Sequence, residues 1–304
     1  MQSLWKFGGL KLKQLAVRVW NEILSDDVFG RAAQLSYYFL LALFPLLILL
    51  TSIFGLVIGS ENELRQNLFN YLAQVMPPSA FQLTDTTLRE VTASSSGGKI
   101  SFGILATLWA ASNGMGAITE SLNVAYDVKE ARPWWKTRLT AILLTIGLSV
   151  LIISALILVL AGGKIATAIA GSFSFGNVFT WSWKVLQWPL VLAFMLLAFA
   201  LIYYFAPNVK DQKWKWITPG SVIGVFLWLL VSFAFRMYLQ FFDSYSATYG
   251  SLGAVIILML WLYLTGAAVL IGGEVNAEIE HAAAEAGARD AKLKGEKSAA
   301  AAAN

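Results

Sequence analysis

The chain has 304 residues, of which 58% are hydrophobic and only 13% are charged. Soluble chains carry about 25% charged residues, so this composition excludes an ordinary soluble protein of this length. With no cysteine and one histidine, His281, the sequence also excludes disulfides, thiolate metal sites and three-histidine zinc sites. The net charge of +4 indicates basic cytoplasmic loops of a membrane protein rather than nucleic-acid binding.

Residues 1–33 are predicted to form a cytoplasmic amphipathic segment. Its apolar positions at helical spacing are Leu12, Leu15, Val19 and Ile23. Two interpretations remain open: a basic helix lying on the membrane surface, and an ordinary helix packed on the bundle. Asp26 and Asp27 then predict the start of a new helix, because carboxylates accept hydrogen bonds from the first N–H groups.

Six apolar blocks are long enough to cross a bilayer, which takes about 20 residues. The blocks are residues 34–59, 100–124, 138–161, 184–206, 216–240 and 250–275. They define a transmembrane domain at 34–281, with a polar helical excursion at 60–99. Residues 162–180, rich in Gly, Ser and Phe, are predicted to be a loop or a partly re-entrant segment. The Ala-rich tail 282–304 has no apolar face and is expected to fray or be disordered.

The sequence therefore predicts an all-α membrane protein with six transmembrane helices, an N-terminal amphipathic helix and a helical extracytoplasmic excursion. Sixteen of the 22 Lys and Arg residues lie in the N-terminal segment, the loops after the second and fourth spans, and the tail. The positive-inside rule then places both termini in the cytoplasm. No cleavable signal peptide is expected, because the first apolar run is longer than a signal h-region.

Polar side chains inside or beside the predicted spans need a reason, because charge is costly in lipid. They gather at the start of the first span, along one face of the second, and near the ends of the fifth and sixth. The candidates are Arg31, Gln34, Tyr38, Asn113, Glu120, Asn123, Asp127, Arg236, Asp243 and Glu274. They form either a polar path or an ion-pair network that holds the bundle together. Predicted depth further suggests that Arg31 pairs with Glu120 or Glu274.

Two further features are expected to be structural. Gly220 with Gly224, and Ala268 with Gly272, have the spacing that lets helices approach closely. His281 lies beside two glutamates, but a solvated side chain is favoured over a metal ligand. No catalytic residue, metal or cofactor is predicted.

Four stretches resemble the YihY/BrkB family of bacterial inner-membrane proteins. They are DDVFGRAAQLSYYFLLALFPLL at 26–47, LWAASNGMGAITESLNVAYDV at 108–128, YYFAPNVKDQKWKWITPGSVIGVFLW at 203–228 and YSATYGSLGAVIILMLWLYLTGAAVLIGGEVNAEIE at 245–280. The resemblance implies a multi-pass protein of the bacterial inner membrane. The family has carried the label ribonuclease BN, which this sequence does not support, since a metal-dependent nuclease needs clustered His and Asp ligands.

Three hypotheses of function follow. The first is a transporter, or a protein that handles lipid or another envelope component, with an unknown substrate. The second is a scaffold or partner subunit of an envelope-assembly system. The third, an intramembrane enzyme, is not favoured. The expected partners are the lipid bilayer, envelope-assembly proteins and a second copy of the chain, and nucleic acid is not expected.

Overall fold

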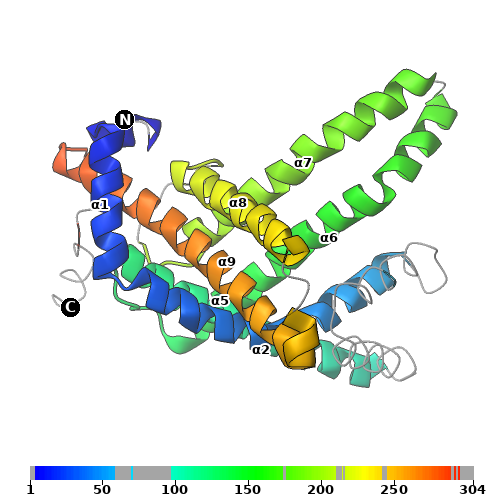
Figure 1. Ribbon diagram of the computed structural model, residues 1–304, viewed down its shortest axis with the longest axis horizontal. Coiled ribbons are helices and arrows are strands. Elements are labelled where there is room, and N and C mark those ends of the chain that lie inside the picture. The colour runs from blue at the N-terminus through cyan, green and yellow to red at the C-terminus, as the bar shows by residue number, and fades with distance from the viewer. Residues whose placement is uncertain are drawn as a thin grey trace. The chain divides into compact units, whose positions relative to one another are not determined.

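The computed structural model describes residues 4–58, 70, 97–173, 176–209, 214, 216–241, 245–288, 291 and 294. Throughout these residues the regular structure is helical and contains no β-strand (Figure 1), which confirms the predicted all-α class. The chain divides into two compact units. Unit 1 is Met1–Ala42, Ser112–Leu144 and Phe199–Asn304, and unit 2 is Leu43–Ala111 and Thr145–Ala198.

The described helices are η1 (Leu4–Gly9), α1 (Leu12–Ser25), α2 (Val28–Ile58), α5 (Gly97–Ala125), α6 (Trp134–Phe173), α7 (Gly176–Phe205), α8 (Pro219–Phe241) and α9 (Tyr245–Glu285). Asp27 begins α2 as expected, because its Oδ1 accepts a hydrogen bond from the Gly30 N–H at 3.3 Å. The predicted helical excursion at 60–99 lies almost wholly outside the described residues.

Four described segments are long and apolar enough to cross a membrane. They are Trp134–Val159, Val185–Phe205, Pro219–Tyr238 and Val255–Glu285. These four coincide with the third to sixth predicted spans. Helices α2 and α5 occupy the positions of the first and second predicted spans, but their described residues are not among these four segments. Six spans therefore stay a prediction.

Of the two alternatives for residues 162–180, the loop is wrong for the described residues, because α6 continues as a helix to Phe173 and α7 begins at Gly176. A partly re-entrant segment stays a prediction. Within unit 2, α6 and α7 run side by side (Figure 1), and Gly162 of α6 faces Trp183 and Gln187 of α7. A continuous helix satisfies the backbone hydrogen bonds that an irregular segment in a bilayer would leave open. This requirement outweighs the cost of Gly in a helix, about 1 kcal/mol for each residue.

Helix α1 packs on α9. Its residues Leu15, Val19 and Ile23 are buried, whereas Leu12 is exposed. Segment η1 also contacts α9, and Gly8 lies so close that an added Cβ would be 2.7 Å from the carbonyl oxygen of Ile279. These contacts favour the helix packed on the bundle. A role for α1 at the membrane surface stays a prediction.

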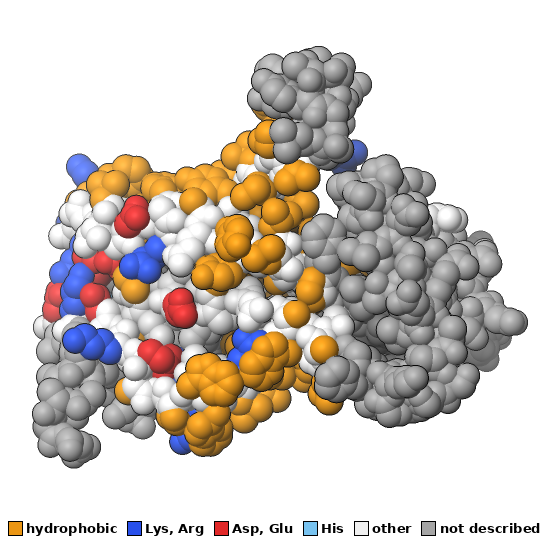
Figure 2. Space-filling view, turned by 90° about the horizontal axis from the view of Figure 1, so that it is seen from below, with side chains coloured by type: hydrophobic (Ala, Val, Ile, Leu, Met, Phe, Trp, Pro, Cys, Tyr) orange, Lys and Arg blue, Asp and Glu red, His pale blue; other side chains and the backbone are white. Residues whose placement is uncertain are grey.

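Large apolar side chains are exposed along the candidate spans. Figure 2 shows hydrophobic side chains over much of the described surface on the face in view. Examples are Val150 on α6, Leu186 on α7, and Phe226 and Phe233 on α8. Soluble monomers rarely expose contiguous apolar surface of this kind, so these faces are suited to contact with lipid.

Candidate functional site: a polar loop clasp and an acidic cluster

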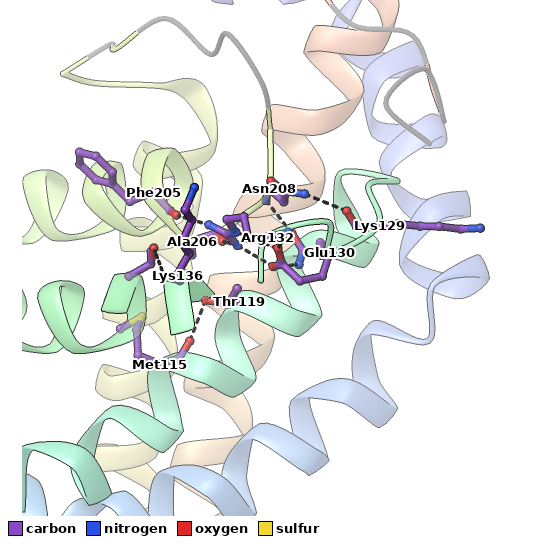
Figure 3. A network of polar contacts seen from close by, with 11 residues as sticks. Met115, Thr119, Lys129, Glu130, Arg132, Lys136, Phe205, Ala206 and Asn208 are labelled. Carbon is purple, nitrogen blue, oxygen red and sulfur yellow. Dashed lines mark hydrogen bonds and ion pairs between the residues drawn. The ribbon is translucent and has the colours of Figure 1, made fainter. Parts of the chain in front are cut away.

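The loop after α5 is tied to the end of α7 by a polar network that we call the loop clasp (Figure 3), formed by Asn123, Lys129, Glu130, Arg132, Ala206 and Asn208. Asn123 is buried at its centre. Its Nδ2 donates to Glu130 Oε2 at 3.0 Å, and its Oδ1 accepts from the Asn208 N–H at 2.7 Å. The candidate Asn123 thus joins two segments far apart in sequence.

Arg132 completes the loop clasp by holding the carboxyl end of α7. Its guanidinium donates to Glu130 Oε1 at 2.8 Å and Oε2 at 2.7 Å, and its Nη2 also donates to the Ala206 carbonyl at 2.8 Å. The last carbonyls of a helix lack partners within the helix, so this contact satisfies one of them. Burial would raise the pKa of Glu130, but the hydrogen bonds from Arg132 and Asn123 outweigh it and lower that pKa.

Helices α8 and α9 meet through small residues, as the glycine spacing predicted. Gly220 faces the backbone of Gly272 so closely that neither position has room for a Cβ. Asn276 accepts from the Gly220 N–H at 2.9 Å and donates to Thr218 Oγ1 at 3.0 Å. Beside them, the Tyr203 hydroxyl donates to the Val269 carbonyl at 2.8 Å. This junction joins α7, α8 and α9 within unit 1.

Five carboxylates of unit 1 form an acidic cluster. Its members are Glu22 of α1, Asp26 directly after α1, Asp127 directly after α5, and Glu274 and Glu278 of α9. The Glu274 carboxylate interacts electrostatically with the other four. Lys294 Nζ lies 2.5 Å from Glu22 Oε2 and 3.5 Å from Asp127 Oδ2, while Arg18 and His281 lie beside Glu278.

Glu274 is the most buried member of the acidic cluster, with 1% of its surface exposed. Its Oε1 has no hydrogen-bond partner among the described residues, and the same is true of Asp26 Oδ2. A buried carboxylate oxygen without a partner costs free energy. Glu274 lies within the candidate span Val255–Glu285.

The backbone at Asp127 favours a different residue from the one present. Its φ of 50° is left-handed, and its N–H donates to Val124 while the Val128 N–H donates to Asn123. This arrangement ends α5 in the way that Gly usually ends a helix. Aspartate tolerates this conformation, although less readily than Gly, and its Oδ2 lies 3.5 Å from Lys294 Nζ. Burial raises the pKa of that carboxyl group, although Lys294 partly lowers it.

His281 is buried, with 5% of its surface exposed, so the expectation of a solvated side chain is wrong. Its Nδ1 lies 3.3 Å from Glu278 Oε1. Arg18 of α1 lies 3.9 Å from Glu278 and pairs with Glu285 at 2.7 Å. Packing of η1 and α1 on the last turns of α9 explains why this end of the helix is not solvated. Among the described residues, no group of three or more His, Asp or Glu is arranged to hold a metal ion.

The predicted ion pair of Arg31 with Glu120 or Glu274 is absent from the described residues. Arg31 Nε instead donates to the Asp26 carbonyl at 2.8 Å. The reason is local, since Arg31 lies in the first turn of α2 and reaches the unpaired carbonyls at the end of α1. Glu120 is exposed on α5.

The remaining candidates are dispersed. Asn113 accepts from Arg138 Nη1 at 2.8 Å. Gln34 and Arg236 are exposed, Tyr38 is half-buried, and Asp243 lies outside the described residues. Sequence reasoning found Asn123, Asp127 and Glu274, but did not assign Glu22, Glu130, Arg132, Asn208 or Lys294 to any site. The four-residue spacing of Glu22 and Asp26 was a usable signal, because it predicts that Asp26, at the end of α1, lies near the side of the helix that carries Glu22.

The chain matches the model of the family described as Virulence factor BrkB over residues 19–297. A Bacillus subtilis (strain 168) protein whose name calls it ribonuclease-like, YfkH, is 38% identical over 248 residues, which are 82% of this chain and 88% of that one. A UPF0761 membrane protein of Idiomarina loihiensis is 32% identical over 72% of this chain and 74% of its own. One from Stenotrophomonas maltophilia is 28% identical over 86% of this chain, which spans only 59% of that longer protein. No solved structure matches.

Proposed function

The chain belongs to the BrkB family of membrane proteins, and on that premise we propose that it transports a cargo or handles a lipid or another envelope component. We further propose that it is a six-span protein of the bacterial inner membrane with both termini in the cytoplasm. The distribution of Lys and Arg supports that orientation.

The observation that carries the proposal is the burial of Glu274. A carboxylate within a candidate membrane span is costly, and such residues mark ion, proton or substrate pathways. Its Oε1 has no hydrogen-bond partner among the described residues, so no described contact explains its position by structure alone. Asp127 supports the same interpretation, because its carboxyl group interacts electrostatically with Glu274 and contacts Lys294 of the tail.

The alternative is a scaffold or partner subunit of an envelope-assembly system, without transport. The close packing of Gly220 on Gly272 favours this alternative, since a scaffold can be packed solid. The two functions differ in what they require of Glu274. A transporter needs its carboxylate, whereas a scaffold needs only the shape of the side chain.

The test is complementation of a deletion strain, followed by profiling of its lipids and small metabolites. The variants are Glu274→Gln, which keeps the shape and removes the charge, and Glu120→Gln as a control on exposed α5 surface. The proposal expects Glu120→Gln to restore the wild-type profile and Glu274→Gln to fail at equal protein level. Full restoration by Glu274→Gln would favour the scaffold.

A further inference from the structure

We propose that the acidic cluster binds a primary ammonium group, and that Lys294 of the tail occupies this site as a tethered competitor. The inference rests on the proposed transport or lipid-handling function and names the chemical class of the cargo. It is carried by the charge of the cluster, the unpartnered oxygen within it, and the side chain that already enters it.

The basic side chains around the acidic cluster pair with only some of its members. Lys294 is shared between Glu22 and Asp127. Arg18 lies 3.9 Å from Glu278 but directs its closest contact to Glu285. Arg31, whose charge lowers the pKa of Asp26, donates to a backbone carbonyl and not to a carboxylate. Asp26 and Glu274 therefore have no direct cationic partner among the described residues.

Glu274 Oε1 is the second, independent observation. It is buried without a donor on a side chain that is 1% exposed, and the Glu274 carboxyl group interacts electrostatically with Asp26 and Asp127. An incoming cationic donor would satisfy this oxygen and offset the repulsion among the carboxylates. A neutral hydrogen-bond donor would satisfy the oxygen but would not offset the repulsion.

The geometry favours an ammonium group over a metal ion. The acidic cluster is not arranged as a metal-binding group, whereas an ammonium group offers three donors that can reach separate carboxylates. Lys294 already uses that chemistry, bridging residues from α1 and from the end of α5. The pKa of Lys294 is raised, since the contacts with Glu22 and Asp127 outweigh the effect of burial.

The position of Lys294 allows its side chain to leave the acidic cluster. Helix α9 ends in a left-handed turn at Gly287 (φ 83°), and Lys294 follows seven residues later, outside the helix. Its side chain remains 49% exposed. A tethered group competes with an effective concentration in the millimolar range. A free amine that binds with similar strength would then bind several-fold more weakly in the presence of Lys294.

Two sources supply a primary ammonium group: the headgroup of an aminophospholipid and a soluble diamine. The experiment uses the full chain in nanodiscs and has one arm for each. In the first arm, phosphatidylethanolamine is compared with phosphatidylcholine in a phosphatidylglycerol background, with bound lipid counted by native mass spectrometry. In the second, radiolabelled cadaverine is titrated into discs that lack phosphatidylethanolamine.

In whichever arm gives binding, Lys294→Gln is expected to increase apparent affinity about threefold or more, as removal of a tethered competitor implies. The matched tail variant Lys297→Gln should bind like wild type. Glu274→Gln should lose binding. Asp127→Asn should also lose amine binding. It replaces Glu274→Gln as the test variant if the latter folds poorly, because asparagine tolerates the left-handed backbone.

Absence of amine binding to both wild type and Lys294→Gln, with thermal unfolding intact, would overturn this inference. Equal affinities of Lys294→Gln and Lys297→Gln would overturn the role of Lys294. Complementation separates the two proposals. If Glu274→Gln fails to complement but no amine binds, the cargo class is wrong and the proposed function stands. If amines bind and Glu274→Gln complements fully, the site stands and the proposed function fails.

Discussion

The guanidinium of Arg132 and the carbonyl of Ala206 lie 2.8 Å apart, and this hydrogen bond joins the loop after α5 to the end of α7. The two residues are 74 positions apart in the chain. Glu130 holds the same guanidinium through two further hydrogen bonds. Glu130 therefore holds the Arg132 guanidinium in the orientation in which it also donates to the Ala206 carbonyl. The planar guanidinium can donate to a carboxylate and a carbonyl at the same time.

Replacing Arg132 with Ala should destabilise the protein by about 2 kcal/mol, since hydrogen bonds to charged groups are each worth about 1.5–3 kcal/mol and water replaces some of them. The measurement is thermal unfolding in detergent. Arg132→Lys should recover only part of the loss, because an ammonium cannot reproduce the bidentate pair. Lys129→Ala is the control, since the loop clasp uses its carbonyl and leaves its side chain exposed. Equal effects of Arg132→Ala and Lys129→Ala would contradict the assignment.

The second prediction concerns steric packing at the α8–α9 junction. Gly220→Ala should lower the folded yield strongly, because the new Cβ would overlap the backbone of Gly272 and the amide of Asn276. Gly116→Ala on α5 is the matched control, because beyond its chain neighbours and its own helix backbone nothing lies within 4 Å of the added carbon. It should be neutral or stabilising by up to about 1 kcal/mol, because Ala favours helices over Gly. Yields measured by fluorescence-detected size exclusion distinguish the two, and a normal yield of Gly220→Ala would refute the close packing.

The sequence predicted the helical class and four of the spans, but it missed the helical continuation of α6 past residue 162 and most of the site. Apolar blocks located the four candidate spans, and two facing small residues, Gly220 and Gly272, were visible as spacings. The contacts of charged residues could not be predicted from the sequence, because they depend on which carbonyl and carboxylate groups the folded chain brings within reach of each side chain. Arg31 illustrates this, since a local carbonyl at Asp26 replaced the expected distant carboxylate. The contacts of Lys294 could not be predicted, because it lies in a polar tail without an apolar periodicity that would show where the tail packs.

Asp26 predicts an unusual dependence of stability on pH. Burial, and then the nearby Asp127 and Glu22, raise its pKa from 3.8 to about 6. Between these values the folded state holds a proton that the unfolded state has lost, so the contribution of Asp26 to stability falls as pH rises toward and through 6. Asp26→Asn should remove this contribution, and its melting temperature should gain most over wild type above pH 6. Melting curves from pH 5 to 8 test this. A constant difference across that range would contradict it.

The ribonuclease-like name of the Bacillus relative leads to a fourth prediction. The purified protein should release no more nucleotide from RNA than a mock preparation, because the sequence has one histidine and, among the described residues, no three His, Asp or Glu side chains are arranged to hold a metal ion. His281 and Glu278, 3.3 Å apart, are the pair to test if activity is found. Activity that co-purifies with the protein and disappears in both His281→Ala and Glu278→Gln would show that the prediction is wrong.

The last prediction concerns orientation in the membrane. The chain has no cysteine, so single cysteines introduced at Ser95 and Ala300 report their own accessibility to an impermeant maleimide. Six spans with cytoplasmic termini place Ser95 outside the cytoplasm and Ala300 inside it. In cells permeabilised only at the outer membrane, Ser95→Cys should therefore be labelled and Ala300→Cys should be protected until the inner membrane is opened. The cysteine-free parent controls for background. The reverse pattern would invert the orientation, and labelling of both positions would indicate an even number of spans between them instead of the five expected.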